Sequence, residues 1–274
     1  MKYVPQKINK NPFKILFKNE FKQHLKSFIW WTVIISVVMF SFIALYPLMA
    51  DMINLMNAVP SEMMDAMIAI TGGDLTTITG YYVMESTETL LIAGSIFAGL
   101  LGVSLINKDF NGGSSEFLYA LPASKGEIWR SKLTVLFTQI FLFNLIVSLT
   151  SLAGMYIFGS GVNIGSYFAY FGLVFILQLE FAIVCFSLAS AFKTKANAGV
   201  AMAIIFISFI LNIIRNIITE ASFIKYISPF AYVSGLVMTN GLSEVNFVLL
   251  AIGAGISIVA LLFGRIKYSY IDVA

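Results

Sequence analysis

The sequence predicts an all-α membrane protein with six membrane-spanning helices. The chain has 274 residues, of which 59% are hydrophobic and only 11% are charged, with a mean hydropathy of +0.88. Soluble domains carry roughly a quarter charged residues. The apolar residues fall into six runs of the length that crosses a bilayer as a helix, about 20 residues. The chain therefore divides into membrane spans rather than into soluble domains.

Residues 1–28 form a basic arm that precedes the first apolar run. Asn11 and Pro12 suit the start of a helix. From there to Lys26, apolar residues occupy one face of a helix and lysines lie beside them. This pattern predicts an amphipathic helix in the headgroup region of the membrane. Two roles stay open for this arm: an anchor for the first span, or a separate contact with a partner protein.

The spans follow in order within a transmembrane domain of residues 29–267. Trp30 and Trp31 mark the interfacial start of the first span. In the second, Gly94, Ala98 and Gly102 have the small-residue spacing that permits close helix packing. The expected spans are approximately 29–49, 87–106, 133–158, 167–192, 199–218 and 245–263, and residues 268–274 form a short tail.

The distribution of basic residues predicts the orientation. Seven lysines lie in the arm, four basic residues in the 107–132 loop, two in the 193–195 loop and two directly after the sixth span. The only others are Lys225 and Arg215. Because basic loops stay in the cytosol, both termini and the 107–132 loop are expected there.

The 107–132 loop is the longest polar segment on the expected cytosolic side. Its residues 114–121 can form about two helical turns, with Ser114 as N-cap and Glu116 near the positive end of the helix. Pro122 ends this helix. The loop therefore predicts a short helix that projects from the membrane domain.

Ser124 and Glu127 stand in capping-box spacing just before the third span, which predicts a defined helix start there. A stiff helix held by such a restart is suited to receive a push from a partner. The alternative for the same residues is a helix that rests on the bilayer surface.

Four polar residues inside the expected spans are candidates for a pathway. Glu180 lies mid-way along the fourth span, Arg215 and Asn212 lie in the outer part of the fifth, and Glu88 lies at the outer end of the second. Arg215 matches Glu88 in depth better than Glu180, from which it differs by about 8 Å along the helix axis. Such residues form either an internal ion pair or hydrogen-bond network, or a polar element of a substrate path.

The sequence lacks the common catalytic and nucleotide-binding motifs. It contains one histidine, His24, and neither the HExxH nor the GxSxG pattern. It also lacks the G-x-x-x-x-G-K-[ST] phosphate-binding loop. No enzyme activity, no cofactor of its own and no nucleic-acid partner are therefore expected.

An ordered set of residues runs through the 107–132 loop. In this order they resemble the coupling-helix segment between spans two and three of ABC type-2 transporter permeases. The usual first acid of that family is Glu and its step is often Gly-Thr, so the resemblance departs mildly at two places. Ser228-Pro229-Phe230 also resembles the family's outer re-entrant segment. The loop residues are Asp109, Gly112-Gly113, Glu116, Leu118 with Leu121, Pro122, Ser124-Lys125, Glu127-Ile128 and Lys132.

The resemblance implies a cytosolic ATPase partner that docks on the coupling helix and binds ATP and magnesium. It also implies a second permease, identical or paralogous. In this scheme Leu118, Tyr119 and Leu121 supply an apolar knob for the ATPase, and Glu116 supplies an ion pair. The ATPase-coupling residues are expected to be Asp109, Glu116, Leu118, Tyr119, Leu121, Pro122, Glu127 and Lys132.

These observations lead to the expectation of a multi-pass permease subunit of an ATP-driven exporter, surrounded by lipids in a bacterial plasma membrane. Its substrate is expected to be a peptide, drug or other amphipathic molecule. Two alternatives stay open. One is a secondary transporter, although inverted repeats and broken spans are not seen. The other is a non-transporting membrane sensor or anchor that assembles with an ATPase.

Overall fold

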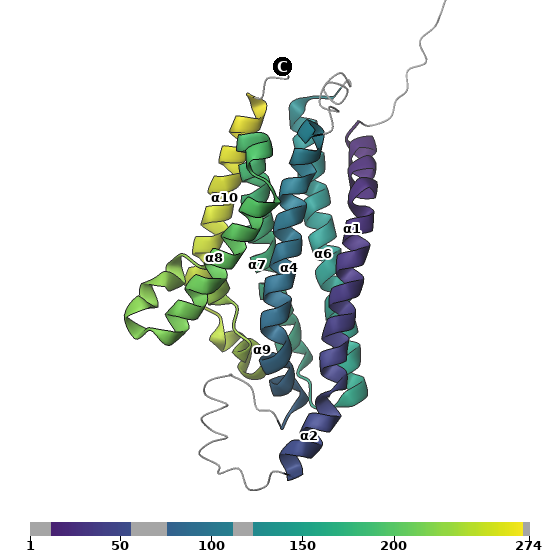
Figure 1. Cartoon of the computed structure of the whole chain (residues 1–274), viewed down its shortest axis with the longest axis vertical. Coiled ribbons are helices and arrows are strands. Elements are labelled where there is room, and N and C mark those ends of the chain that lie inside the picture. The colour runs from purple at the N-terminus through teal and green to yellow at the C-terminus, as the bar shows by residue number, and fades with distance from the viewer. Residues whose placement is uncertain (1–11, 56–75, 112–122, 271–274) are drawn as a thin grey trace, which may run out of the picture.

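The computed structural model describes residues 12–55, 76–111 and 123–270, and over these ranges it is helical without any strand (Figure 1). Six helices within them are long and apolar enough to cross a membrane, which confirms the predicted all-α architecture with six spans. The long helices are α1 Pro12–Ala44, α4 Ile78–Asn111, α6 Lys125–Phe158, α7 Ile164–Phe192, α8 Ala198–Ile217 and α10 Phe247–Ser269.

Short helices join the long ones, and several of them are 3₁₀ helices, labelled η. Lys193–Lys195 (η1) makes the tight connection between α7 and α8 that the sequence predicts. The others are α2 Tyr46–Leu55, η2 Thr219–Tyr226, η3 Pro229–Tyr232, α9 Leu236–Asn240 and η4 Gly241–Glu244.

The first helix differs from the expected division into an arm and a span. α1 runs without a break from Pro12 to Ala44 and packs along α6 and α4 (Figure 1). The described part of the arm is therefore continuous with the first span instead of forming a separate interfacial helix. The physical reason is local: no glycine or further proline interrupts this stretch, and Leu16, Glu20 and Phe28 continue its buried face.

α4 and α7 form the centre of the bundle. In their most apolar stretches 67% of the residues are buried, against 17% in α8 and 22% in α10. The predicted small-residue spacing is confirmed, because a Cβ at Gly102 would lie 2.5 Å from the backbone oxygen of Ala182 on α7. Ala98 is fully buried one turn earlier. The outer helices expose large apolar side chains, as helices in contact with lipid do.

Both described ends of the chain lie at one end of the bundle, which we call the terminal end (Figure 1). The start of α1 and the last turn of α10 are found there, together with the end of α4 at Asn111 and the start of α6 at Lys125. The Nζ of Lys125 donates to the backbone oxygen of Ser269 at 3.4 Å. The loop that joins α4 to α6 therefore leaves and rejoins the bundle at the terminal end.

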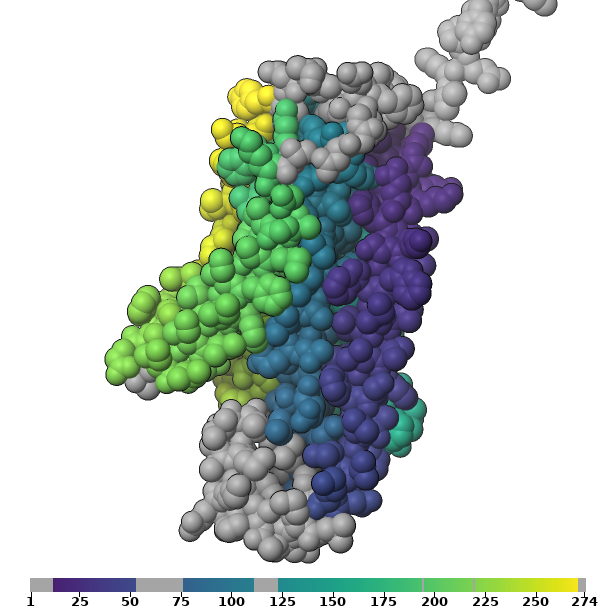
Figure 2. Space-filling model, viewed as in Figure 1, coloured from purple at the N-terminus to yellow at the C-terminus, as the bar shows by residue number. Residues whose placement is uncertain are grey.

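The segment between α8 and α10 leaves the bundle sideways as η2 and returns to it as η3 and α9 (Figure 1). The Ser228 hydroxyl donates to the backbone oxygen of Ser208 at 2.7 Å, which fixes the return to α8. Phe230 and Tyr232 are buried in the bundle. On the face shown in Figure 2, α4 lies open between α1 and α8.

Candidate functional site

Four charged side chains meet near the terminal end of the bundle, between α1, α4 and α6. The Nζ of Lys132 lies 2.9 Å from Glu20 Oε1 and 2.9 Å from Asp109 Oδ2. It also donates to the backbone oxygen of Leu105 at 2.7 Å. Lys108 pairs with the other oxygen of Glu20. We call Glu20, Lys108, Asp109 and Lys132 the charge cluster.

Three members of the charge cluster are buried, while the Lys108 side chain is 23% exposed, and the cluster is electrically balanced. Lys132 is 0% exposed and Glu20 is 4% exposed. Two lysines face two acids, so the formal charge of the cluster is zero. Burial of ions in this way is costly unless they are paired and hydrogen-bonded. The pairing therefore holds three helices in one arrangement at the base of the 107–132 loop.

The first turn of α6 begins with the predicted capping box. The backbone N–H of Ser124 donates to Glu127 Oε2 at 2.8 Å, and the backbone N–H of Glu127 donates to Ser124 Oγ at 3.2 Å. The two bonds satisfy donors that a helix start otherwise leaves without partners. The restart of the chain after the loop is therefore fixed locally as well as by the charge cluster.

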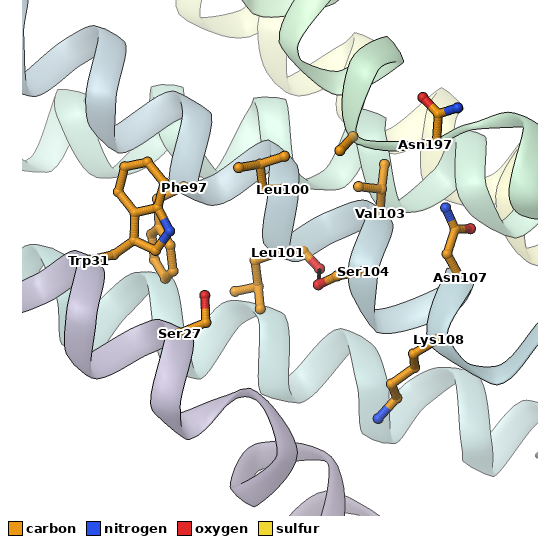
Figure 3. Close-up of a pocket in the computed structure, with 11 residues that line it drawn as sticks. Ser27, Trp31, Phe97, Leu100, Leu101, Val103, Ser104, Asn107, Lys108 and Asn197 are labelled. Atoms are coloured by element: carbon orange, nitrogen blue, oxygen red, sulfur yellow. Dashed lines mark hydrogen bonds between the residues drawn. The ribbon is translucent and has the colours of Figure 1, made fainter. Parts of the chain in front are cut away.

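A cavity of about 490 Å³ lies between α1, α4 and the start of α8 (Figure 3). One end of it is aromatic, with Trp31 and Phe97 at a ring-centroid distance of 6.0 Å. The other end is polar and holds Asn107, Lys108 and Asn197 (Figure 3). The cavity is thus amphipathic along its length, and it shares Lys108 with the charge cluster.

A second cavity of about 760 Å³ lies nearer the opposite end of the bundle, between α4, α8, η3 and α9. Glu88, Asn212 and Arg215 line it together. Glu88 and Arg215 make no ion pair with each other in the described structure. Arg215 donates instead to Asn216 Oδ1 at 2.7 Å. This cavity therefore offers both signs of charge at its wall.

Glu180 lies apart from the second cavity. Its Oε2 accepts a hydrogen bond of 2.9 Å from the hydroxyl of Tyr232 on η3, and the carboxylate lies against Gly253 of α10. Glu180 is 4% exposed. It therefore joins α7 to η3 by one hydrogen bond and packs against α10.

The comparison with protein families decides which kind of protein carries these features. A family model described as "ABC-2 family transporter protein" matches residues 15–264, which is nearly the whole chain. The chain belongs to the ABC-2 transporter family. A comparison with curated proteins finds none that matches it. The ABC-2 family supplies membrane permeases of ABC transporters, which typically work with a cytosolic ATPase subunit.

The predicted coupling residues of this ABC-2 permease divide into two groups. Asp109 and Lys132 are buried and bond to each other within the membrane domain. Glu127 caps α6. The remaining five residues lie outside the described residues. Four of them are predicted to contact the ATPase directly, and the fifth is the proline that follows: Glu116, Leu118, Tyr119, Leu121 and Pro122.

The predicted pathway residues divide as well. Glu88, Asn212 and Arg215 line one cavity of the ABC-2 permease, and no ion pair joins Glu88 to Arg215 in the described structure. Glu180 contributes to a different contact. The Oδ1 of Asn212 and the Nε of Arg215 are buried without a hydrogen-bond partner in the described structure. The two residues that line this cavity therefore each keep one polar atom without a hydrogen bond.

Glu20 is the residue that sequence reasoning missed. It is the only acid in the basic arm of residues 1–28, which holds seven lysines. One signal was present: Glu20 follows Leu16 by four residues and so lies on the apolar face of the helix rather than among the lysines. An acid on the buried face of a basic helix requires a buried cation.

Proposed function

We propose that this chain is the permease subunit of an ATP-driven exporter in the plasma membrane of a bacterium. The observation that carries the proposal is its membership of the ABC-2 family over residues 15–264. Because the sequence has no phosphate-binding loop, ATP and magnesium belong to a separate ATPase subunit. The terminal end of the bundle then faces the cytosol, in accordance with its basic residues.

The ATPase docks on the loop between α4 and α6 in this proposal. Leu118, Tyr119 and Leu121 enter a groove of the ATPase, and Glu116 pairs with one of its basic residues. Two features of the described structure support this use of the loop. The charge cluster fixes the helices at its base, and the capping box at Ser124 fixes its exit.

A second permease, identical or paralogous, completes the pathway in this proposal. The open face of α4 carries both larger cavities, one amphipathic and one with charges of both signs. A molecule that passes along this face meets aromatic rings and polar groups in turn. The substrate class that fits such a lining is an amphipathic molecule such as a peptide or drug.

The docking step is tested with the double variant Leu118→Ala, Tyr119→Ala. We expect the ATPase that co-purifies with the tagged permease to be lost at least tenfold, while the variant still elutes as a folded membrane protein. The matched control is Phe137→Ala, which changes an exposed apolar residue on α6. Undiminished ATPase capture and transport by the double variant would refute the proposed docking.

Transport is tested in inside-out vesicles that contain the permease and its ATPase, with a fluorescent amphipathic peptide and an amphipathic dye as probes. We expect uptake with ATP and none with a hydrolysis-deficient ATPase. Uptake driven by an ion gradient without ATP would indicate a secondary transporter. ATP-dependent movement of the permease without uptake of either probe would favour the sensor role.

A further inference from the structure

We propose that Glu20 is a positioning residue that makes α1 follow the movement of the 107–132 loop. The inference rests on the proposed function, since it concerns how motion from an ATPase spreads in the permease. It assigns a role in coupling to α1, which neither carries the loop nor adjoins it in sequence.

Glu20 joins the two helices that carry the loop. Its Oε1 lies 2.9 Å from the Nζ of Lys132 on α6, and its Oε2 pairs with Lys108 on α4. Lys108 stands about one turn before the end of α4 at Asn111, and Lys132 stands about two turns after the start of α6 at Lys125. One carboxylate on α1 is therefore shared between the helix that enters the loop and the helix that leaves it.

The charge balance makes this contact difficult to separate. If α1 moved alone, Lys108 and Lys132 would share only Asp109, and one positive charge would lose its partner in a place that solvent reaches only in part. Such a charge is far more costly than the loss of an apolar contact, because apolar contacts can slide and form again. A neighbouring polar contact also holds α1 to α4, since Lys108 donates a hydrogen bond to Gln23 of α1. The ends of α1, α4 and α6 therefore move as one unit.

The movement of α1 reaches the amphipathic cavity. Ser27 and Trp31 line that cavity from α1 (Figure 3). They follow Glu20 by seven and eleven residues on one unbroken helix, which is about 10 and 16 Å along its axis. A shift of the loop that Glu20 passes to α1 thus moves Trp31, together with Phe97 on α4, relative to Asn197 and Ala198 at the start of α8. α1 becomes a second moving wall beside the helices that carry the loop.

The test compares the wild type with the double variant Glu20→Leu, Lys108→Met in nanodiscs with the co-purified ATPase. The double variant keeps the cluster neutral, because Lys132 and Asp109 still pair, so an unpaired buried charge does not confuse the result. Spin labels at exposed positions report two distances, Lys18→Cys on α1 and Thr134→Cys on α6, each to Ile258→Cys on α10, in a Cys185→Ser background.

In the wild type, we expect ATP with vanadate to shift the α1–α10 and α6–α10 distances together. In the double variant, the α6–α10 shift should persist, and the α1–α10 shift should fall by more than half. Lys22→Gln, a neutralised exposed lysine on α1, should behave like the wild type. Glu20→Ala with Lys108→Ala serves as the second variant if the first gives no monodisperse complex.

A full α1–α10 shift in either double variant would overturn the role of Glu20 and leave the proposed function intact. A wild type that captures no ATPase, or that shows no ATP-dependent shift of α6, would instead overturn the proposed function and this inference with it. Loss of both shifts in a variant that still binds the ATPase would also contradict the inference, because α6 should move without Glu20.

Discussion

At the scale of single residues, the buried charged side chains Glu20, Asp109, Lys132 and Glu180 each have an ion-pair or hydrogen-bond partner. Lys132 reaches two acids and a backbone oxygen, and each oxygen of Glu20 meets a different lysine. Ions in an apolar interior persist when they are paired in this way. The consequence is an asymmetry: removal of one partner should cost far more than removal of a matched pair.

The variant Glu20→Leu should lower stability by about 3–5 kcal/mol, because Lys108 loses its counter-charge in a largely buried place. Glu20→Leu with Lys108→Met should recover most of that loss, since apolar residues of similar volume often replace a buried ion pair without penalty. Thermal unfolding in detergent, followed by size-exclusion chromatography, measures both. Equal melting temperatures for the single and double variants would contradict the pairing.

Glu180 yields a second residue-scale prediction. Tyr232→Phe removes the hydroxyl that donates to Glu180 and leaves the ring in place, so it should cost about 1–3 kcal/mol through a buried acceptor without its donor. Tyr226→Phe, at a half-exposed ring of η2, should change the melting temperature little. A melting temperature of Tyr232→Phe equal to that of the wild type would show that the contact contributes no stability.

At the scale of elements, N-cap residues in the sequence fix where helices begin. Ser124, Asn163, Asn197 and Asn246 each accept a hydrogen bond from the first turn of a long helix. At Ser124 the sequence predicts such a cap as part of a capping box, and the structure confirms it. At the expected boundary near residue 28, α1 contains neither glycine nor proline, and it continues through that position.

Ser124→Ala should remove the side-chain cap of α6 and cost about 1 kcal/mol. We also expect faster hydrogen exchange in the first turn of α6 and weaker capture of the ATPase, because the exit of the loop loses its fixed direction. Asn163→Ala, which removes the cap of α7 at the opposite end of the bundle, is the matched control. It should destabilise by a similar amount without any effect on ATPase capture.

At the scale of the whole molecule, the distribution of basic residues and the positions of the helix ends favour the same orientation in the membrane. The described ends of α1 and α10 lie together with the base of the loop at the terminal end (Figure 1). An even number of spans requires the two ends to lie on the same side of the membrane. The basic residues gathered there favour a cytosolic position for this end.

The orientation is checked by cysteine labelling in intact cells. Ser160→Cys, at an exposed turn between α6 and α7, should react with a membrane-impermeant maleimide, and Lys195→Cys, in η1, should react only after the cells are opened. The native Cys185 is 1% exposed and should contribute little background. The reverse pattern of labelling would invert the topology and exclude a cytosolic ATPase at the loop.

By itself the sequence determined the all-α class and the number of spans, since hydropathy and helix length act locally. The tertiary structure alone decided which polar groups meet. Lys132 and Glu20 are 112 residues apart in the chain, and their pairing depends on how α1 packs against α6. Likewise Glu180 meets Tyr232 rather than Arg215 because η3 returns into the bundle. Contacts between distant segments depend on helix rotation and approach, which no local pattern of residues specifies.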